Sequence, residues 1–197
     1  SMIRLYGRQA DLTGKADTMS LKSLISARPP GSQFVSMHPL QDSLNFYAMA
    51  GEYNLNTNTL TAEGVKIIKS ADAAIFPGDE KVEIREGAQM QPLLDAIIIA
   101  DTANRNHMIT QAVVTVESKK SYRANGTYAF ENAVGDVQNI EFDMVTVDSN
   151  FRTVAEGEVF PEQNFQLNPA INYRGKVFLN ARHPQLDFDG AFIINQD

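Results

Sequence analysis

Hydrophobic and polar residues alternate along much of the second half of the chain. Three stretches have this pattern, and their apolar or small faces are Tyr122, Ala124, Gly126, Tyr128 and Phe130, then Phe151, Thr153, Ala155, Gly157 and Val159, then Leu186, Phe188, Gly190, Phe192 and Ile194. Side chains two positions apart share a face in a strand, whereas a helix repeats every 3.6 residues. Each stretch is therefore predicted to be a β-strand with one buried face.

Shorter runs add further strands to this prediction. Residues 113–116, 140–147 and 177–179 are rich in β-branched or large apolar residues, which favour strands. Clusters of Asn, Asp, Gly, Ser and Pro separate the runs and are typical of turns. Between residues 105 and 164 these turns recur near residues 105, 119, 135, 149 and 163. One strand in roughly every 15 residues predicts about 13 strands in the chain.

Evidence for helices is weak. Residues 20–27 could form two helical turns ended by Pro29 and Pro30, but the same residues could form a strand. Pro92 makes a helix over residues 89–94 unfavourable. We therefore predict an all-β fold, a twisted β-slab or jelly roll of stacked antiparallel hairpins with a strand repeat of about 15 and 30 residues.

Four glycines favour the longer repeat. Gly126 and Gly157 lie 31 residues apart, Gly190 follows after another 33, and Gly64 precedes Gly126 by 62. Each shares the apolar face of its predicted strand, where a glycine permits close approach of the opposing sheet or a bend, without a ligand role. After Gly64 the apolar positions shift by one residue, which predicts a β-bulge.

Composition is that of a globular chain with a core. The 197 residues, of which 43% are hydrophobic, fit one domain over residues 1–197. The absence of cysteine excludes disulfides and thiolate metal sites. A formal net charge of -7 argues against nucleic acid as a partner. Residues 1–35 have five basic and two acidic residues (net +3), so this segment either docks on an acidic neighbour or differs by chance.

The ends of the chain suggest a wider context. No apolar run approaches the roughly 18 residues of a membrane-spanning helix, and no signal peptide opens the chain. Ser1 and Met2 are typical of an expression scar, and the final residues directly follow a predicted strand. We therefore expect the chain to be a piece of a longer protein.

Residues typical of catalysis or metal binding are sparse. His38, His107 and His183 lie in or next to predicted turns, without the spacing of a metal site, and are expected to be solvated. The chain has no G-x-S-x-G, Walker A or G-x-G-x-x-G motif. We therefore predict no catalytic residue, no metal site and no cofactor, in a protein that is not an enzyme.

Three pairs of carboxylates share a strand face, Glu141 with Asp143, Glu156 with Glu158 and Asp187 with Asp189. Carboxylates two residues apart line an acidic groove, as glycosidases require, or form the solvated face of an ordinary strand. The lack of tryptophan weakens a sugar site, because stacking platforms favour Trp and Tyr.

A resemblance to a known family rests on short motifs. Residues 52–66, with the sequence Glu-Tyr-Asn-Leu-Asn-Thr-Asn-Thr-Leu-Thr-Ala-Glu-Gly-Val-Lys, resemble a repeat of the OstA-like family, which includes periplasmic bridge proteins of lipopolysaccharide transport. Residues 70–76 and 99–103 are similar to its A-D-x-A element. The resemblance covers residues 52–130 best. From about residue 35 the chain is also similar to regions of long uncharacterised envelope proteins of Bacteroidetes-type bacteria.

The resemblance implies a β-slab open at its ends and located in the cell envelope, periplasmic or associated with the outer membrane. It also implies a scaffold or a lipid- or lipopolysaccharide-binding role, and our candidates for lipid-facing residues are Ile67, Ile98, Val114 and Phe142. The first and last strands would pair with neighbouring modules of the parent protein or with another envelope protein. The alternative is a carbohydrate-binding or carbohydrate-active domain with an acidic groove formed by Glu156, Glu158, Asp187 and Asp189.

Overall fold

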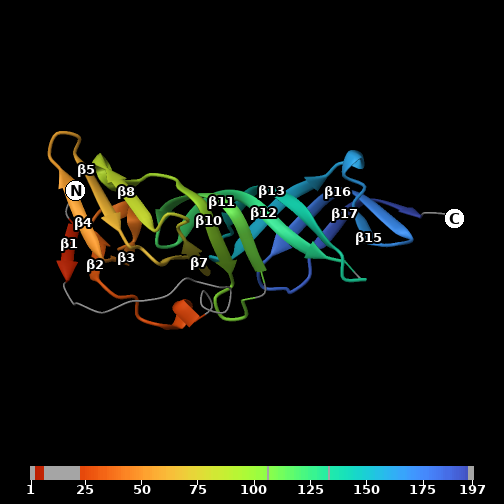
Figure 1. Ribbon diagram of the computed structural model, residues 1–197, viewed down its shortest axis with the longest axis horizontal. Helices are drawn as coiled ribbons and strands as arrows, with labels where there is room; N and C mark the ends of the chain where they lie inside the picture. The colour runs from red at the N-terminus through yellow and green to blue at the C-terminus, as the bar shows by residue number, and fades with distance from the viewer. Residues whose placement is uncertain (1–2, 7–22, 106, 133, 195–197) are drawn as a thin grey trace.

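The chain forms an elongated all-β structure (Figure 1). The computed structural model describes residues 3–6, 23–105, 107–132 and 134–194, and of residues 3–6 only the backbone. Residues 23–26 form one helical turn within the predicted 20–27, of which residues 20–22 lie outside the described residues. Three short 3-10 helices are described, η1 (Pro39–Gln41), η2 (Glu86–Ala88) and η3 (Pro161–Gln163).

The strands run antiparallel to their neighbours. They are β1 (Ile3–Tyr6), β2 (Ser32–Ser36), β3 (Asn45–Ala48), β4 (Ala50–Asn54), β5 (Thr59–Glu63), β6 (Ile68–Ser70), β7 (Ala73–Phe76), β8 (Lys81–Arg85), β9 (Gln89–Met90), β10 (Leu93–Ala100), β11 (His107–Ser118), β12 (Ser121–Glu131), β13 (Val137–Val147), β14 (Thr153–Val159), β15 (Gln166–Asn168), β16 (Ile171–Asn180) and β17 (Asp187–Ile194).

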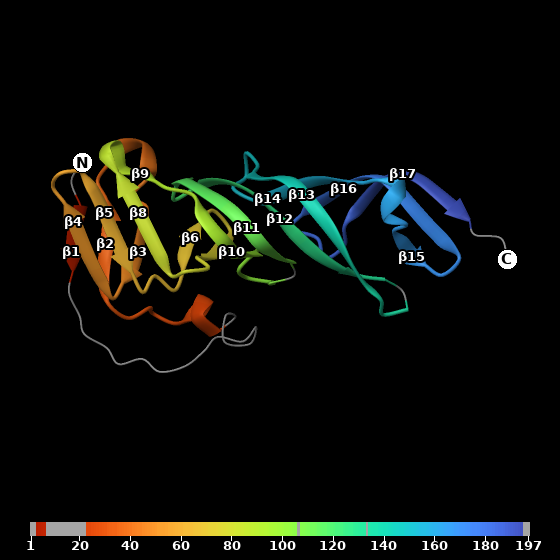
Figure 2. The ribbon, with the colours of Figure 1, turned by 45° about the horizontal axis from the view of Figure 1, so that its top comes forward.

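These strands form two sheets. The long sheet has 13 strands in the order β1-β2-β3-β6-β7-β10-β11-β12-β13-β14-β16-β15, and β17 also pairs with β16. The second sheet has the order β4-β5-β8-β9 and packs against β2 and β3 at the N-terminal end (Figure 2). β1 and β17 therefore lie at opposite ends of the long axis.

From β10 to β14 the strands follow the predicted spacing, and they begin at residues 93, 107, 121, 137 and 153. The prediction of about 13 strands in the whole chain is wrong, because the described residues form 17. The extra strands lie between residues 32 and 90, where strands of two to five residues alternate between the two sheets. Gly64 has φ +72 and lies where the chain crosses from β5 in the second sheet to β6 in the long sheet. The predicted β-bulge after Gly64 is therefore wrong, because the apolar positions shift there through a change of sheet.

Large side chains in register build the main core, the buried cluster that extends from Phe34 to Leu186. Residues that pair across neighbouring strands form one row along the long sheet. In sheet order from β2 to β13 they are Phe34, Phe46, Ile68, Ile75, Ile98, Ile109, Tyr128 and Ile140. This register makes the interior continuous from the two-sheet end toward β16 and β17.

The predicted faces of β12 and β14 are confirmed, because residues 122, 124, 126, 153, 155, 157 and 159 are buried. Two parts of the prediction are wrong. Phe151 is exposed in the turn before β14, and Gly190, Phe192 and Ile194 are exposed although they share a face with buried Leu186. In β17 the cause is position, because no described strand covers that end of the slab.

Candidate functional site

The four lipid-facing candidates are all buried, but they do not meet in one place. Ile98, Val114 and Phe142 belong to the main core. Ile67 belongs to a separate cluster on the other face of the long sheet. The structure therefore places three of the four residues in the packed main core and the fourth on the other face of the long sheet.

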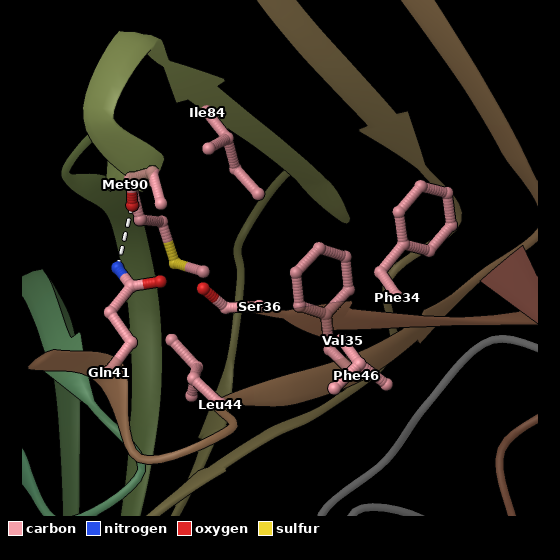
Figure 3. A pocket seen from close by; sticks show the side chains of 9 residues that line it. Phe34, Val35, Ser36, Gln41, Leu44, Phe46, Ile84 and Met90 are labelled. Carbon is pink, nitrogen blue, oxygen red and sulfur yellow. Dashed lines mark hydrogen bonds between the residues drawn. The ribbon is translucent and has the colours of Figure 1, made fainter. Parts of the chain in front are cut away.

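A small cavity lies between the two sheets (Figure 3). Its walls include the stacked rings of Phe34 and Phe46, whose centroids are 5.4 Å apart, and the side chains of Ile84 and Met90. Gln41 closes one side by donating from Nε2 to the carbonyl oxygen of Ala88 at 2.6 Å. The cavity measures about 20 Å³, which is room for about one water molecule and far less than an acyl chain occupies.

The four acidic candidates do converge, on the outer face of β14, β16 and β17. Glu158, Lys176 and Asp189 are paired across these three strands, and Glu156 and Asp187 lie in the adjacent row. Lys176 Nζ donates to Glu156 Oε1 at 2.6 Å. This hydrogen bond and the charge of Glu156, with smaller contributions from Glu158 and Asp189, raise the pKa of Lys176. Lys176 thus faces three of the four carboxylates, those of Glu156, Glu158 and Asp189.

A surface groove of about 280 Å³ adjoins this acidic face. Its walls include Glu156 and Asp187, with Phe178 paired between them and Met144 paired with Glu156. Such a groove offers carboxylate acceptors beside an aromatic ring, which suits a polar or cationic ligand. Within the described part of the chain, no group of three His, Asp or Glu is arranged to hold a metal ion.

β17 ends in an exposed apolar strand edge. It pairs with β16 on one side, and no described strand pairs with its other side. Phe188 and Phe192 pack on Tyr173 with ring centroids 5.0 and 5.3 Å apart. Phe192, Ile193 and Ile194 nevertheless remain 57%, 44% and 72% exposed. The apolar interior therefore continues to the surface at this end.

His107 is fully buried, so the expectation that it is solvated is wrong. Its Nε2 lies 2.6 Å from the carbonyl oxygen of His183, to which it donates. Its Nδ1 then accepts from the hydroxyl of Tyr128 at 3.2 Å. The signal that sequence reasoning missed is the period-two pattern of β11, which places His107 on the buried face of Ile109.

Asp72 is a second buried polar group that the sequence did not indicate. Its Oδ1 accepts from the backbone N–H of Thr153 at 3.0 Å and from the Thr153 hydroxyl at 2.6 Å, which in turn accepts from Tyr122 at 2.7 Å. Its Oδ2 is buried 4.0 Å from Arg152 and has no hydrogen-bond partner among the described residues. Burial raises the pKa of Asp72, and the hydrogen bonds and Arg152 oppose this only in part.

Among the described residues, no helix is both long and apolar enough to cross a membrane. No family model, curated protein or solved structure matches the chain.

Proposed function

We propose that the chain is a non-enzymatic structural module of the cell envelope, joined to a neighbouring β-module through the free edge of β17. The observation that carries this proposal is the exposed apolar end of β17, formed by Phe192, Ile193 and Ile194. The envelope location rests only on the resemblance of residues 52–66 to OstA-like repeats.

Strand addition fits this edge for two reasons. An uncovered edge offers unpaired backbone N–H and C=O groups, and proteins usually protect such edges with charges, proline or bulges. β17 has charges only in its first half, at Asp187 and Asp189, whereas residues 190–194 have none. An added strand with apolar inward residues would cover Phe192 and Ile194 and continue the main core.

The packed interior supports a scaffold over a lipid carrier. The cavity between the sheets holds about one water molecule, and the candidate lipid-facing residues are in packed clusters. We expect native mass spectrometry of the purified protein to give the mass of the chain alone. A co-purified lipid would contradict the scaffold role.

The edge is tested with a short peptide of alternating valine and lysine. Its valines would face Phe188, Phe192 and Ile194, and its lysines would lie beside Asp187 and Asp189. We expect amide hydrogen exchange in β17 to slow by about tenfold or more when the peptide is bound, because the strand edge becomes hydrogen bonded. Replacing Phe192 and Ile194 together by Asp should abolish this protection.

Leu55→Asp is the matched control for this experiment. Leu55 is 81% exposed in the hairpin between β4 and β5, far from β17, so this variant should bind the peptide like the original chain. Protection spread over both ends of the slab, or retained in the Phe192/Ile194 variant, would show that β17 is not the site.

A carbohydrate-binding function is the second candidate, and the groove beside the acidic face favours it. The groove places the carboxylates of Glu156 and Asp187 next to the ring of Phe178. Glycan-array screening would test it. Binding that is lost on replacing Asp187 and Asp189 by Ala would support the groove, and binding that survives both changes would exclude it.

A further inference from the structure

The outer face of the long sheet has an apolar patch on β7 and β10. Along β7, Ala73 and Ile75 face the main core, so the alternate residues Ala74 and Phe76 face outward. They pair with Ile99 and Ile97 of β10. On β12 and β13 the outer face instead has exposed polar residues, among them Arg123, Asn125, Asn139, Glu141 and Asp143. The patch is therefore more apolar and more buried than this part of the outer face.

A single turn of helix covers this patch. Residues 23–26 lie at the side of the long sheet (Figure 2), and Leu24 and Ile25 pack on the patch together with Ile67. Ile25 is only 6% exposed, whereas Ser26, Ala27 and Arg28 on the same turn and just after it are exposed. A helix this short is unstable alone, so contact with the patch must hold it in place.

Two cations, Lys69 and Arg105, donate hydrogen bonds to the turn. Lys69 Nζ donates to the carbonyl oxygen of Ile25 at 2.6 Å, and Arg105 donates to the hydroxyl of Ser26 at 2.9 Å. Neither cation forms an ion pair with a carboxylate in the described part of the chain. A carboxylate in the position of Ser26 would make charge-assisted hydrogen bonds, which are about twice as strong as neutral ones.

We propose that this patch is a docking site for a short helical segment of another protein, and that residues 23–26 occupy it in competition with that partner. The partner segment has two adjacent large aliphatic residues followed by Asp or Glu. The aliphatic pair takes the places of Leu24 and Ile25, and the carboxylate binds Arg105 and Lys69. This site is independent of β17 and does not rest on the structural role proposed above.

The probe is a capped peptide with the sequence of residues 20–28, in which Ser26 is replaced by Glu. In the full chain, Ile25→Asp releases the helical turn, and Ala27→Asp adds the same charge at an exposed position just after that turn. Fluorescence anisotropy measures binding, and methyl NMR signals of Ile97 and Ile99 locate it. We expect the Ile25→Asp chain to bind the peptide at least about tenfold more tightly than the Ala27→Asp chain, because the competing segment is gone.

Two further measurements do not depend on the Ile25→Asp variant. Ser26→Glu in the full chain should strengthen the internal contact, raise the melting temperature and weaken peptide binding below that of the original chain. The Glu peptide should also bind more tightly than the unsubstituted peptide, and Arg105→Ala should remove that difference. Equal binding by the Ile25→Asp and Ala27→Asp chains, or equal binding of the two peptides, would overturn the proposal.

Discussion

Buried polar side chains join strands that are far apart along the chain. Asp72, in the turn before β7, binds Thr153 at the start of β14, and Thr153 binds Tyr122 of β12. His107 joins β11 to the loop after β16. Because an unpaired buried polar group is costly, these contacts fix how the sheet curls more specifically than apolar packing does.

The Asp72 carboxylate should make stability depend on pH. Burial raises the pKa of Asp72 in the folded protein above its ordinary value of 3.8, so the folded state binds this proton more readily than the unfolded chain. The contribution of Asp72 to the free energy of unfolding therefore increases as the pH falls through its folded pKa toward 3.8. Urea unfolding of the original chain and of Asp72→Asn should show their stability difference shifting in favour of the original chain on acidification.

Asp148 is a control of opposite sign. Hydrogen bonding from the Arg152 backbone N–H holds the pKa of Asp148 below its usual value, so its contribution is lost on acidification. The original chain should therefore lose its advantage over Asp148→Asn at low pH. A stability difference between the original chain and Asp72→Asn that does not vary with pH would exclude Asp72 as a titrating group.

These polar contacts could not be predicted from the sequence. His107 and His183 are 76 residues apart, and Asp72 and Thr153 are 81 apart, so no local pattern links them. The acidic face was accessible in part. Period-two alternation places Glu156 with Glu158 and Asp187 with Asp189, but only the strand register adds Lys176 and Phe178.

Strand prediction succeeded where strands are long and buried on one face. β12, β13 and β14 alternate over at least seven residues, so their period is clear. β7 has four residues and is buried on both faces, so it has no alternation to detect. The strands of the second sheet have at most five residues, so they offer too few positions for a period to be clear.

Gly157 permits close packing of β14 on β13. Gly126 and Gly157 both pair with Phe142, from opposite sides, and a Cβ on Gly157 would overlap the carbonyl oxygen of Glu141. Gly157→Ala should therefore lower the free energy of unfolding by about 1–3 kcal/mol, as overpacking does. Chemical denaturation measures this loss.

Gly87→Ala separates steric overlap from backbone strain. Gly87 has φ +75 but open space around it, so alanine there adds strain without a clash. We expect a loss of about 1 kcal/mol. A Gly157→Ala chain as stable as the original would mean that β13 and β14 separate at little cost.

The slab is long, but the main core runs through most of it. The cluster includes Phe46 and Ala48 of β3 near one end and Val177 and Leu179 of β16 near the other. A packed interior shared by both ends couples their stability, because a cavity at one end weakens contacts that the other end also uses. We therefore expect the two ends to unfold together.

Val177→Ala tests this coupling. Hydrogen exchange at increasing urea concentrations should show β3 and β16 opening at the same midpoint. The substitution should lower the free energy of unfolding by about 2 kcal/mol at both strands, and so lower both midpoints. Leu40→Ala, at an exposed position in η1, should leave both unchanged. Separate midpoints for the two strands would mean that the slab consists of two independent units.

The alternation of the N-terminal strands between two sheets has a consequence for folding kinetics. From β10 to β14 each strand pairs with the next one along the chain, so these contacts close short loops. β3 instead pairs with β6, and β5 pairs with β8. In both cases the two strands that lie between the partners along the chain belong to the other sheet. The later half of the chain therefore has the lower contact order, and we expect it to form the folding nucleus although it is synthesised last. The N-terminal end would then fold onto a slab that already exists.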